Sequence, residues 1–400
     1  MKLQNLYPCV IGLGYVGFPI FTKLDKKFKT VGYDINLKRI NNLKKGININ
    51  KINQNKFRVK NKSLFKNKLK DIKYCNFYII TVPTPIYDNQ KPNLEFLIKA
   101  TKTVGKVLKK GDIVFYESTV YPGVTLEVCL PILKKISKLN YKTDFNIGYS
   151  PERINPGDKK NTLRNITKLI SFENLKIKKK ALLIYKSISK KILISNSIIE
   201  TETSKVIENI QRDLNIALMN EIFIVCKRLN IDFKNVIKLA STKWNFLKFN
   251  PGLVGGHCLP VDPYYFAFLA KKNKIKTNII LSGRHVNNFM KNFFISEIKK
   301  KINKKEKLLI FGVSYKENVP DLRNSLSLKV YIELKKNFNV SAFDSSIKNK
   351  ADIKKYKLKA KIGNLKKYDK FLFLVNHDSQ KKYLNLINKK HKEKIIKIIN

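Results

Sequence analysis

A glycine-rich turn near the N-terminus limits the folds open to this chain more than any other feature. The turn, Gly12-Leu-Gly14-Tyr15-Val16-Gly17, directly follows an apolar strand and opens a helical pattern. Glycines at this spacing permit a tight turn, close approach of a pyrophosphate to backbone N–H groups, and tight packing of the helix. Asp34 ends the next expected strand, where a carboxylate can accept hydrogen bonds from a ribose. This order predicts dinucleotide binding, and the acid favours NAD because it would repel the 2′-phosphate of NADP.

Apolar strands alternate with helical stretches through the first half of the chain. Such alternation predicts a parallel sheet with right-handed crossovers. The expected strands are Cys9–Ile11, Thr30–Tyr33, Phe77–Val82, Ile113–Glu117 and Phe145–Tyr149. We therefore expect an α/β protein in which residues 1–198 form an NAD-binding Rossmann domain.

The second half combines a long helix with another α/β segment. Apolar residues recur at helical spacing from Glu200 to Leu229, and a Gly/Pro-rich loop over 250–263 and more helix follow. These features predict a central helical domain over residues 199–300. A smaller Rossmann-like domain over 301–400 is expected from a helix starting near Leu326 and three strands: Leu308–Val313, Val340–Phe343 and Phe371–Val375.

The chain is strongly basic, because 82 Lys and Arg against 29 Asp and Glu give a formal net charge of +53. Such a field attracts phosphate, so nucleic-acid binding is one interpretation. The lysines are dispersed, however, and no nucleic-acid-binding motif accompanies them. We favour compositional drift and expect no specific nucleic-acid partner, although a positive field would help to attract an anionic substrate.

The cysteines and the lengths of the apolar runs indicate in which cellular compartment the protein works. Five scattered cysteines without a CxxC pair or zinc spacing predict free thiols and no metal site. No apolar run approaches the roughly 20 residues that span a bilayer. The first seven residues lack the apolar stretch of a signal peptide. We therefore expect a cytoplasmic protein that does not contact a membrane.

One cysteine stands out, in the segment Gly255-Gly256-His257-Cys258-Leu-Pro-Val-Asp262. A lone cysteine is more often a small buried apolar residue than a nucleophile. Two glycines beside it favour the second reading, because they let backbone amides and a substrate come close. Asp262 could position water or accept a proton. We interpret His257 as structural, because adjacent side chains in a loop usually diverge.

Further polar groups lie on the long helix and on loops that follow strands. Lys205 and Asn209 are four residues apart on one helix face and could hold a developing oxyanion, although a solvated face is the simpler reading. Thr119 and Glu152 lie on loops that would form the ligand crevice of a doubly wound sheet. Both types are also common as loop hydrogen-bonding residues.

The loop from Gly312 to Ser325 follows the first strand of the smaller α/β domain. It carries the basic residues Lys316 and Arg323 but no glycine-rich fingerprint. This composition suits a nucleotide held by side-chain charge rather than a second dinucleotide.

These motifs, in this order, resemble the UDP-glucose/UDP-N-acetylhexosamine 6-dehydrogenase family over nearly the whole chain. The most specific stretches are 149–158, Tyr-Ser-Pro-Glu-Arg-Ile-Asn-Pro-Gly-Asp, and 242–258, which includes Thr-Lys-Trp-Asn-Phe-Leu and Pro-Gly-Leu-Val-Gly-Gly-His-Cys. They look most like the Vi-antigen and O-antigen type UDP-N-acetylglucosamine 6-dehydrogenases. The resemblance implies an NAD domain, a helical dimerisation segment and a UDP-binding domain in a homodimer or larger homo-oligomer.

The resemblance also implies roles for individual residues. Cys258 would capture a C6 aldehyde as a thiohemiacetal, and a second NAD would oxidise this to a thioester that water hydrolyses. Lys205 and Asn209 would stabilise charge on oxygen, and Asp262, Thr119 and Glu152 would handle water and protons. The positions that match NAD contacts include Asp34, Arg39, Thr84, Thr119 and Arg323. Those that match sugar-nucleotide contacts are Glu152, Arg153, Ile154, Asn155, Lys205, Asn209, Phe249, Pro251, Gly255 and Lys316, with Arg284 reaching a neighbouring subunit.

Departures from the family pattern bear on the substrate. UDP-glucose members usually carry a glutamate where this chain has Pro156, which favours the N-acetylhexosamine branch. Asn93 replaces a usual Asp, and Asp344-Ser345 replaces the usual Asp-Pro, both at positions expected to be peripheral to the chemistry. Among the candidate substrates, we therefore rank UDP-N-acetylglucosamine first, its galacto and manno epimers next and UDP-glucose last. A single-step hydroxyacid-type dehydrogenase is an alternative, but it would need no cysteine loop.

Overall fold

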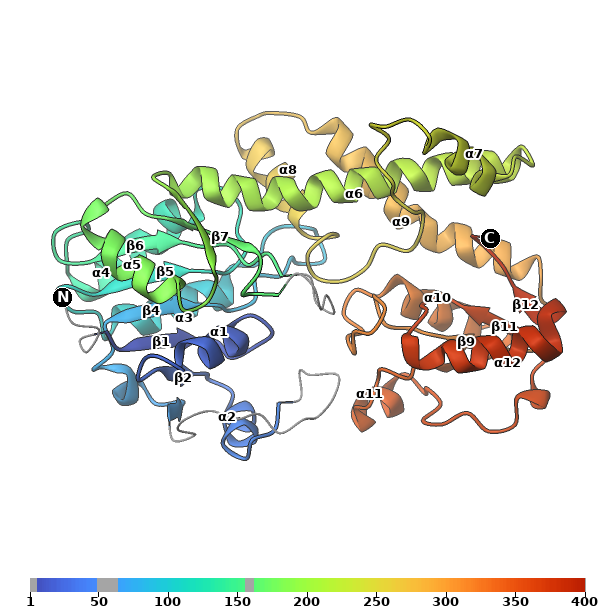
Figure 1. Cartoon of the computed structure of the whole chain (residues 1–400), viewed down its shortest axis with the longest axis horizontal. Coiled ribbons are helices and arrows are strands. Elements are labelled where there is room, and N and C mark those ends of the chain that lie inside the picture. Colours follow the sequence, from blue (N-terminus) through green and yellow to red (C-terminus); the bar gives the residue numbers. More distant parts are fainter. Residues whose placement is uncertain (1–5, 49–63, 155–161, 400) are drawn as a thin grey trace. The chain divides into compact units, whose positions relative to one another are not determined.

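The computed structural model describes residues 6–48, 64–154 and 162–399. The chain divides into two compact units, Met1–Glu208 with Tyr264–Lys274, and Asn209–Pro263 with Ile275–Asn400. Figure 1 shows the elements of both, coloured along the sequence. Among the described residues, no helix combines the length and apolar character needed to cross a membrane.

The first unit contains an eight-stranded sheet in the order β3-β2-β1-β4-β5-β6-β7-β8. Its first six strands follow the doubly wound order, whose direction reverses between β1 and β4, where such sheets bind ligands. The strands are β1 (Pro8–Ile11), β2 (Val31–Tyr33), β3 (Phe65–Lys66), β4 (Phe77–Ile80), β5 (Ile113–Tyr116), β6 (Asn146–Tyr149), β7 (Thr167–Ser171) and β8 (Lys191–Ser195). The helices are α1 (Gly17–Leu24), α2 (Leu37–Lys44), α3 (Glu95–Gly105), α4 (Leu130–Ser137) and α5 (Lys178–Tyr185).

The core of the first unit explains why these strands form. β1, β4 and β5 are buried along their whole length, as expected for parallel strands covered on both faces. Phe77 and Phe115 stack on neighbouring strands with ring centroids 5.4 Å apart. The expected α/β fold is therefore confirmed.

Three strands of this sheet were not expected from the sequence, and one pairing differs from the prediction. The unexpected strands are the two-residue β3, β7 and β8. β6 pairs with β7 antiparallel, so the sheet is mixed rather than wholly parallel. β7 could not be predicted from an apolar run, because Lys168, a charged residue, occupies a fully buried position within it. β8 could not be predicted because it is an edge strand whose residues are half-buried or exposed.

Helix α6 (Ile198–Arg228) confirms the long central helix, and it begins and ends within two residues of the expected limits. The other helices of the central segment are α7 (Phe233–Ala240), α8 (Asp262–Lys272) and α9 (Asn278–Lys299). α7 starts after Asp232, whose side chain accepts hydrogen bonds from the backbone N–H groups of Lys234 and Asn235.

The second unit also holds a small parallel sheet in the order β10-β9-β11-β12. β9 lies between β10 and β11, just as β1 lies between β2 and β4 in the first unit. Its elements are β9 (Lys307–Phe311), α10 (Leu326–Lys335), β10 (Asn339–Phe343), α11 (Lys350–Lys355), β11 (Lys370–Phe373), α12 (Lys381–His391) and β12 (Ile395–Ile396). The smaller Rossmann-like sheet expected at this end of the chain is confirmed.

Candidate active and nucleotide-binding sites

The glycine turn after β1 has the geometry that its sequence predicts. Gly12 adopts φ +91°, and its N–H donates to the Tyr33 carbonyl over 2.8 Å. A Cβ on Gly17 would lie 1.9 Å from the carbonyl oxygen of Gly12, so a side chain there is excluded. A Cβ on Gly14 would meet nothing within 4 Å. The middle glycine therefore borders open space, while the outer two shape the turn.

The residues around this turn fit a dinucleotide. Val16, the residue before α1, makes no side-chain capping bond, and Gly14 borders open space close to this helix N-terminus, a setting that suits a pyrophosphate. Asp34 accepts hydrogen bonds from the N–H of Leu13 over 2.8 Å and of Asn36 over 2.9 Å. A carboxylate has about four acceptor sites, so Asp34 can still accept ribose hydroxyls.

Arg39 lies beneath the turn rather than on its surface. Its Nε donates to the Leu13 carbonyl and its Nη2 to Asn48, both over 2.9 Å. Burial lowers the pKa of this guanidinium, and the nearby Asp34 partly offsets that shift. Arg39 thus supports the backbone from which Asp34 and the glycine turn would hold the cofactor.

Thr84 and Thr119, expected at the cofactor site, are brought together on the loops that follow β4 and β5. The Thr84 hydroxyl donates to the Thr119 carbonyl over 2.5 Å. Tyr265 on α8, which no sequence pattern singled out, donates its hydroxyl to the Thr84 carbonyl. Its ring is fully buried, so α8 anchors this loop. A buried tyrosine needs a partner for its hydroxyl, but the sequence does not reveal which one.

Helix α6 is joined to the loop after β5 by Glu202. This carboxylate accepts hydrogen bonds from the N–H of Gly123 over 2.6 Å and of Thr125 over 3.0 Å. Burial raises its pKa to about 7, an effect that these hydrogen bonds partly offset. Lys205, one turn further along α6, is also buried. A loop–helix anchor thus lies one turn away from the predicted catalytic lysine.

The loop after β6 carries the expected residues Glu152, Arg153 and Ile154, while Asn155 lies outside the described residues. Arg153 pairs with Glu208 on α6 over 2.8 Å and donates to the Thr167 carbonyl over 2.9 Å. Ile154 packs against the core of the first unit. The backbone N–H groups of Arg153 and Ile154 both donate to Glu152. The loop therefore holds Glu152 by its own backbone.

In the second unit, Cys258 lies just before α8 with two other expected residues. The N–H of Asp262 donates to the Cys258 carbonyl over 2.9 Å, and Asn209 donates its side-chain amide to Asp262 over 2.5 Å. Cys258 is partly exposed, whereas the other four cysteines are buried. A partly exposed cysteine, an aspartate joined to it through the backbone and an amide bonded to that aspartate are therefore linked by hydrogen bonds.

The expectation that His257 diverges from Cys258 is wrong. Its Nδ1 lies 4.0 Å from the Cys258 sulfur, the long limit for a hydrogen bond to sulfur. The chain bends over residues 256–258, beginning at Gly256 with φ +97°, and this bend brings the adjacent side chains to the same side. The His257 ring also meets Tyr315 edge-on, with centroids 6.0 Å apart.

The loop 312–325 touches the cysteine loop directly. Asn324, in the left-handed region at φ +51°, donates its amide to the Gly256 carbonyl over 3.1 Å. A Cβ on Gly255 would lie 2.8 Å from the Asn324 carbonyl oxygen, and one on Gly256 would lie 2.8 Å from the Tyr315 ring. The two glycines are therefore required because the neighbouring loop packs on them.

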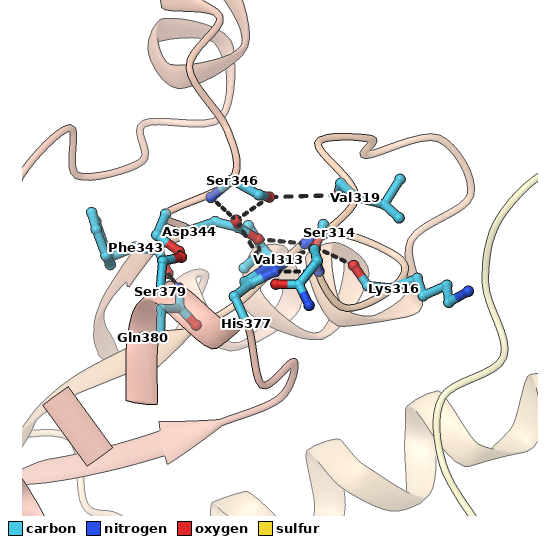
Figure 2. A network of polar contacts seen from close by, with 12 residues as sticks. Val313, Ser314, Lys316, Val319, Phe343, Asp344, Ser346, His377, Ser379 and Gln380 are labelled. Atoms are coloured by element: carbon cyan, nitrogen blue, oxygen red, sulfur yellow. Dashed lines mark hydrogen bonds and ion pairs between the residues drawn. The ribbon is translucent and has the colours of Figure 1, made fainter. Parts of the chain in front are cut away.

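A buried carboxylate, Asp344 at the end of β10, organises loop 312–325 (Figure 2). It accepts hydrogen bonds from the N–H groups of Val313 and Ser314, both over 2.8 Å. Ser346 donates both its N–H and its hydroxyl to it. Burial raises the pKa of Asp344, but its contacts with His377 and the other donors outweigh this and hold the pKa well below the usual range.

His377 is oriented by a contact on each ring nitrogen. Its Nδ1 accepts the N–H of Asn318 over 2.8 Å, so this nitrogen carries no proton. The proton of the neutral ring is therefore assigned to Nε2, which lies 3.0 Å from Asp344 and 3.1 Å from the Ser314 hydroxyl. Because Asp344 and Ser314 share one nitrogen, this is not the arrangement of a serine nucleophile triad.

The two basic residues of loop 312–325 differ in their surroundings. Arg323 forms an ion pair with Asp321 over 2.6 Å and remains half exposed. Burial raises the pKa of Asp321, but hydrogen bonds from Arg323 outweigh it and lower the pKa. Lys316 is half-buried, and its carbonyl accepts the Ser314 hydroxyl. Both cations lie on a loop held from below by Asp344.

The segment with Phe249 and Pro251, both half-buried, is held by a buried polar chain. Asn220 exchanges hydrogen bonds with the backbone of Gly252 and donates to Asn287 over 2.8 Å. Asn287 donates in turn to Asp213, which pairs with Arg284 over 2.6 Å. Arg284 is 1% exposed. Within this chain, Arg284 therefore supports the loop from inside the unit.

These arrangements define a class of protein. One Rossmann unit has a glycine turn shaped for a dinucleotide, and the other brings an accessible cysteine, a carboxylate and an amide beside a basic loop at the end of a second nucleotide-type sheet. This combination is typical of a nucleotide-dependent dehydrogenase with a cysteine in its site.

The comparisons with known proteins are specific. The chain matches three models of the UDP-glucose/GDP-mannose dehydrogenase family: the NAD binding domain over residues 7–189, the central domain over 200–289 and the UDP binding domain over 309–398. A UDP-N-acetyl-D-glucosamine 6-dehydrogenase from Salmonella typhi is 47% identical over 344 residues, covering 84% of this chain and 81% of that protein. One from Pseudomonas aeruginosa is 44% identical and covers 86% and 83%.

A solved structure supports the same assignment. The UDP-D-ManNAc dehydrogenase from Pyrococcus horikoshii superposes with a TM-score of 0.83 at 28% identity, covering 98% of this chain and 93% of that one. The chain belongs to the UDP-glucose/GDP-mannose dehydrogenase family. It is an oxidoreductase with NAD as its cofactor, which confirms the family and the cofactor expected from the sequence.

Proposed function

We propose that this enzyme oxidises the C6 hydroxyl of UDP-N-acetylglucosamine to the carboxylate, in two NAD-dependent oxidations that pass through Cys258. The observation that carries the proposal is the partly exposed Cys258, whose carbonyl accepts the N–H of Asp262, the carboxylate that Asn209 contacts. The two curated relatives at 44% and 47% identity, both UDP-N-acetyl-D-glucosamine 6-dehydrogenases, favour this sugar. Its uronate product suits a precursor of a surface polysaccharide.

The chemistry divides between the cofactor and the chain. NAD, when bound, accepts a hydride from C6 in each of the two oxidations, and in the first the C6 hydroxyl also gives its proton to a base, which leaves the aldehyde. After the first, the thiolate of Cys258 adds to the C6 aldehyde, so a C–S bond forms and the oxygen takes a proton as a thiohemiacetal. Loss of the second hydride and of the hydroxyl proton leaves a thioester. Water then adds to its carbonyl carbon, the C–S bond breaks, and the acid leaves with the thiol restored.

The chain's polar residues would serve these steps. Lys205 and Asn209, one turn apart on α6, would stabilise negative charge on the C6 oxygen. Asp262, Thr119 and Glu152 would share the handling of water and protons. The glycine turn, with Asp34, Arg39, Thr84 and Arg323, would hold NAD. The sugar nucleotide would be held by Glu152, Arg153, Ile154, Asn155, Lys205, Asn209, Phe249, Pro251, Gly255 and Lys316, and Arg284 would serve the substrate site of a neighbouring subunit.

The deciding experiment counts NADH per molecule of sugar nucleotide. We would test UDP-N-acetylglucosamine, its galacto and manno epimers, and UDP-glucose with wild type and Cys258→Ala. Two NADH per sugar, lost in the variant, are expected. Cys226→Ala, at a buried cysteine on α6, is the matched control and should keep both. One NADH per sugar, or an active Cys258→Ala enzyme, would instead support the single-step dehydrogenase.

We also propose a homodimer built on the central helices. Support comes from large apolar side chains left exposed on the second unit: Leu218, Val225 and Leu229 recur along and just after α6, Leu239 lies on α7, and Trp244 is 92% exposed. A second copy of the chain would cover them. The single substitution Leu229→Arg should therefore shift the protein toward monomer in sedimentation experiments. Leu193→Arg, at an exposed leucine on β8, should not.

The division into domains over residues 1–198, 199–300 and 301–400 also remains a proposal. Limited proteolysis should cut near residues 198 and 300 if these are the boundaries. We place the enzyme in the cytoplasm, a location supported by five cysteines that form no disulfide among the described residues.

A further inference from the structure

A lysine is buried in the sheet of the first unit. Lys168 lies on β7, two residues from the core residue Ile170, and both side chains are 0% exposed. Strand positions of this kind normally carry apolar residues, because burying a charge is costly unless it is paired and hydrogen-bonded. A cation buried here must therefore be paired with neighbouring carboxylates or hydrogen-bonded to nearby acceptors.

The ammonium of Lys168 faces the loops that follow β5 and β6. It lies 2.5 Å from a carboxylate oxygen of Glu117, 3.1 Å from the Pro151 carbonyl and 3.6 Å from Oε2 of Glu152. Glu117 directly follows β5, and Glu152 is the third residue after β6. One buried cation thus holds the ends of both loops.

Glu152 is constrained at both oxygens. Its Oε1 accepts the N–H of Arg153 over 2.7 Å and that of Ile154 over 2.6 Å. Its Oε2 is buried, has no hydrogen-bond partner among the residues that the structure describes, and forms an ion pair with Lys168 over 3.6 Å. The backbone therefore orients one oxygen of the carboxylate, and the ion pair with Lys168 holds the other.

The electrostatics of the cluster agree with this arrangement. Burial lowers the pKa of Lys168, but Glu117 and Glu152 outweigh that effect and raise it, so the cation persists. Burial raises the pKa of Glu117 to about 7, partly offset by Lys168. The titratable and charged groups that face the cluster are Glu117 after β5, Glu152 and Arg153 after β6, Tyr185 on α5 and Glu208 on α6.

We propose that Lys168 is a positioning residue, whose buried ammonium holds the Glu152 carboxylate in place for its part in water and proton handling. This inference rests on the proposed function, because it assigns Glu152 a catalytic role. Lys168 itself acts through Glu152 rather than on the substrate. If the cluster served stability alone, its loss would lower thermal stability and leave the kcat of the folded enzyme unchanged.

The first test compares Lys168→Met with Lys168→Arg. Without the cation, the Glu152 carboxylate should lose its buried ion pair and with it a fixed orientation. At pH 7, kcat should fall roughly tenfold, with KM changed less than about threefold. Lys168→Arg should restore kcat. Lys191→Met, on the paired strand β8 at an exposed lysine, is the matched control and should be unchanged.

A double-mutant cycle separates positioning from structure. If Lys168 acts through Glu152, adding Lys168→Met to Glu152→Gln should cost little further activity. The carboxylate through which Lys168 acts is already absent from Glu152→Gln. Independent losses that multiply would overturn the proposal. Adding Glu117→Gln to Lys168→Met removes the unpaired carboxylate and should restore thermal stability, but not kcat. Recovery of both would show that the role is structural.

A spectroscopic measurement keeps this test apart from the proposed function. Carbon-13 labelling of glutamate carboxyls, with Glu152 assigned from the Glu152→Gln variant, reports the surroundings of this carboxyl without turnover. A shifted or broadened Glu152 resonance in Lys168→Met, with Lys168→Arg close to wild type, supports the inference even if no UDP-sugar is oxidised, an outcome that would defeat the proposed function alone. An unchanged Glu152 resonance in a folded Lys168→Met protein would overturn the inference.

Discussion

The turns after β1 and β9 are built on the same plan but use their acidic residue differently. In each, a left-handed glycine follows the first strand and donates its N–H to the end of the second: Gly12 to Tyr33, and Gly312 to Phe343. In each, an aspartate after the second strand accepts the next backbone N–H over 2.8 Å. The first half of the mononucleotide-binding motif is thus present twice.

The difference lies in what else surrounds the aspartate. Asp34 is half-buried and keeps acceptor capacity for a ribose, beside the opening at Gly14. Asp344 is buried and receives four backbone or hydroxyl donors and His377. The same local device therefore serves a ligand in one unit and holds a loop in the other, whose nucleotide contacts fall to side chains such as Lys316.

The sharpest way to break the first turn is Gly17→Ala. Its Cβ would lie 1.9 Å from the Gly12 carbonyl oxygen, so the turn must open. We expect a loss of about 3–5 kcal/mol in the free energy of unfolding and at least roughly 100-fold weaker NAD binding. Denaturant unfolding and calorimetry measure both. Gly14→Ala is the control: it should weaken NAD binding but change stability by about 1 kcal/mol or less, since its Cβ enters open space.

Replacing the two aspartates should separate their roles. Asp344→Asn should cost about 3 kcal/mol or more of stability, because it leaves buried donors unpaired. Asp34→Asn should cost less than about 1 kcal/mol while weakening NAD binding. The folded pKa of Asp344 is depressed, so its stabilisation is present above its unfolded value and lost as pH falls. Acid unfolding of wild type should be steeper than that of Asp344→Asn, and equal slopes would contradict this.

Glu202 should make the first unit respond to pH in the opposite direction. Its pKa of about 7 is raised above the unfolded value of 4.5, so its stabilisation is present below pH 4.5 and lost as pH rises through 7. The shift corresponds to about 3 kcal/mol. Glu202→Gln should flatten this decline between about pH 5 and 8, measured by denaturant unfolding. Glu200→Gln, exposed on the same helix, is the control.

The smallest expected effect concerns the contact between loop 312–325 and the cysteine loop. Asn324→Gly removes the hydrogen bond to the Gly256 carbonyl while tolerating the left-handed backbone. We expect kcat to fall roughly threefold to tenfold, with UDP affinity nearly unchanged, because about 1 kcal/mol of positioning is lost. Asn318→Gly, also left-handed but bonded to Asp378, is the control. A drop in UDP affinity instead would place Asn324 in nucleotide binding.

Much of this protein follows from local sequence. The glycine turn, Asp34, the buried strands β1, β4 and β5, and helix α6 were predictable, because turn geometry and side-chain periodicity depend on neighbouring residues. The segment 255–262 likewise predicted a cysteine site from its own glycines. These features are local, so one sequence suffices to find them.

Only the tertiary structure decided which distant residues meet. Lys168 hides β7 from a search for apolar runs, and its partners Glu117 and Glu152 follow other strands. The low pKa of Asp344 depends on His377, on a different strand's loop, and the need for Gly256 depends on Tyr315. Burial, charge pairing and close packing arise between segments remote in sequence. No local sequence pattern encodes these contacts. They decide why the turn after β1 is open to a ligand while the similar turn after β9 is used to hold a loop.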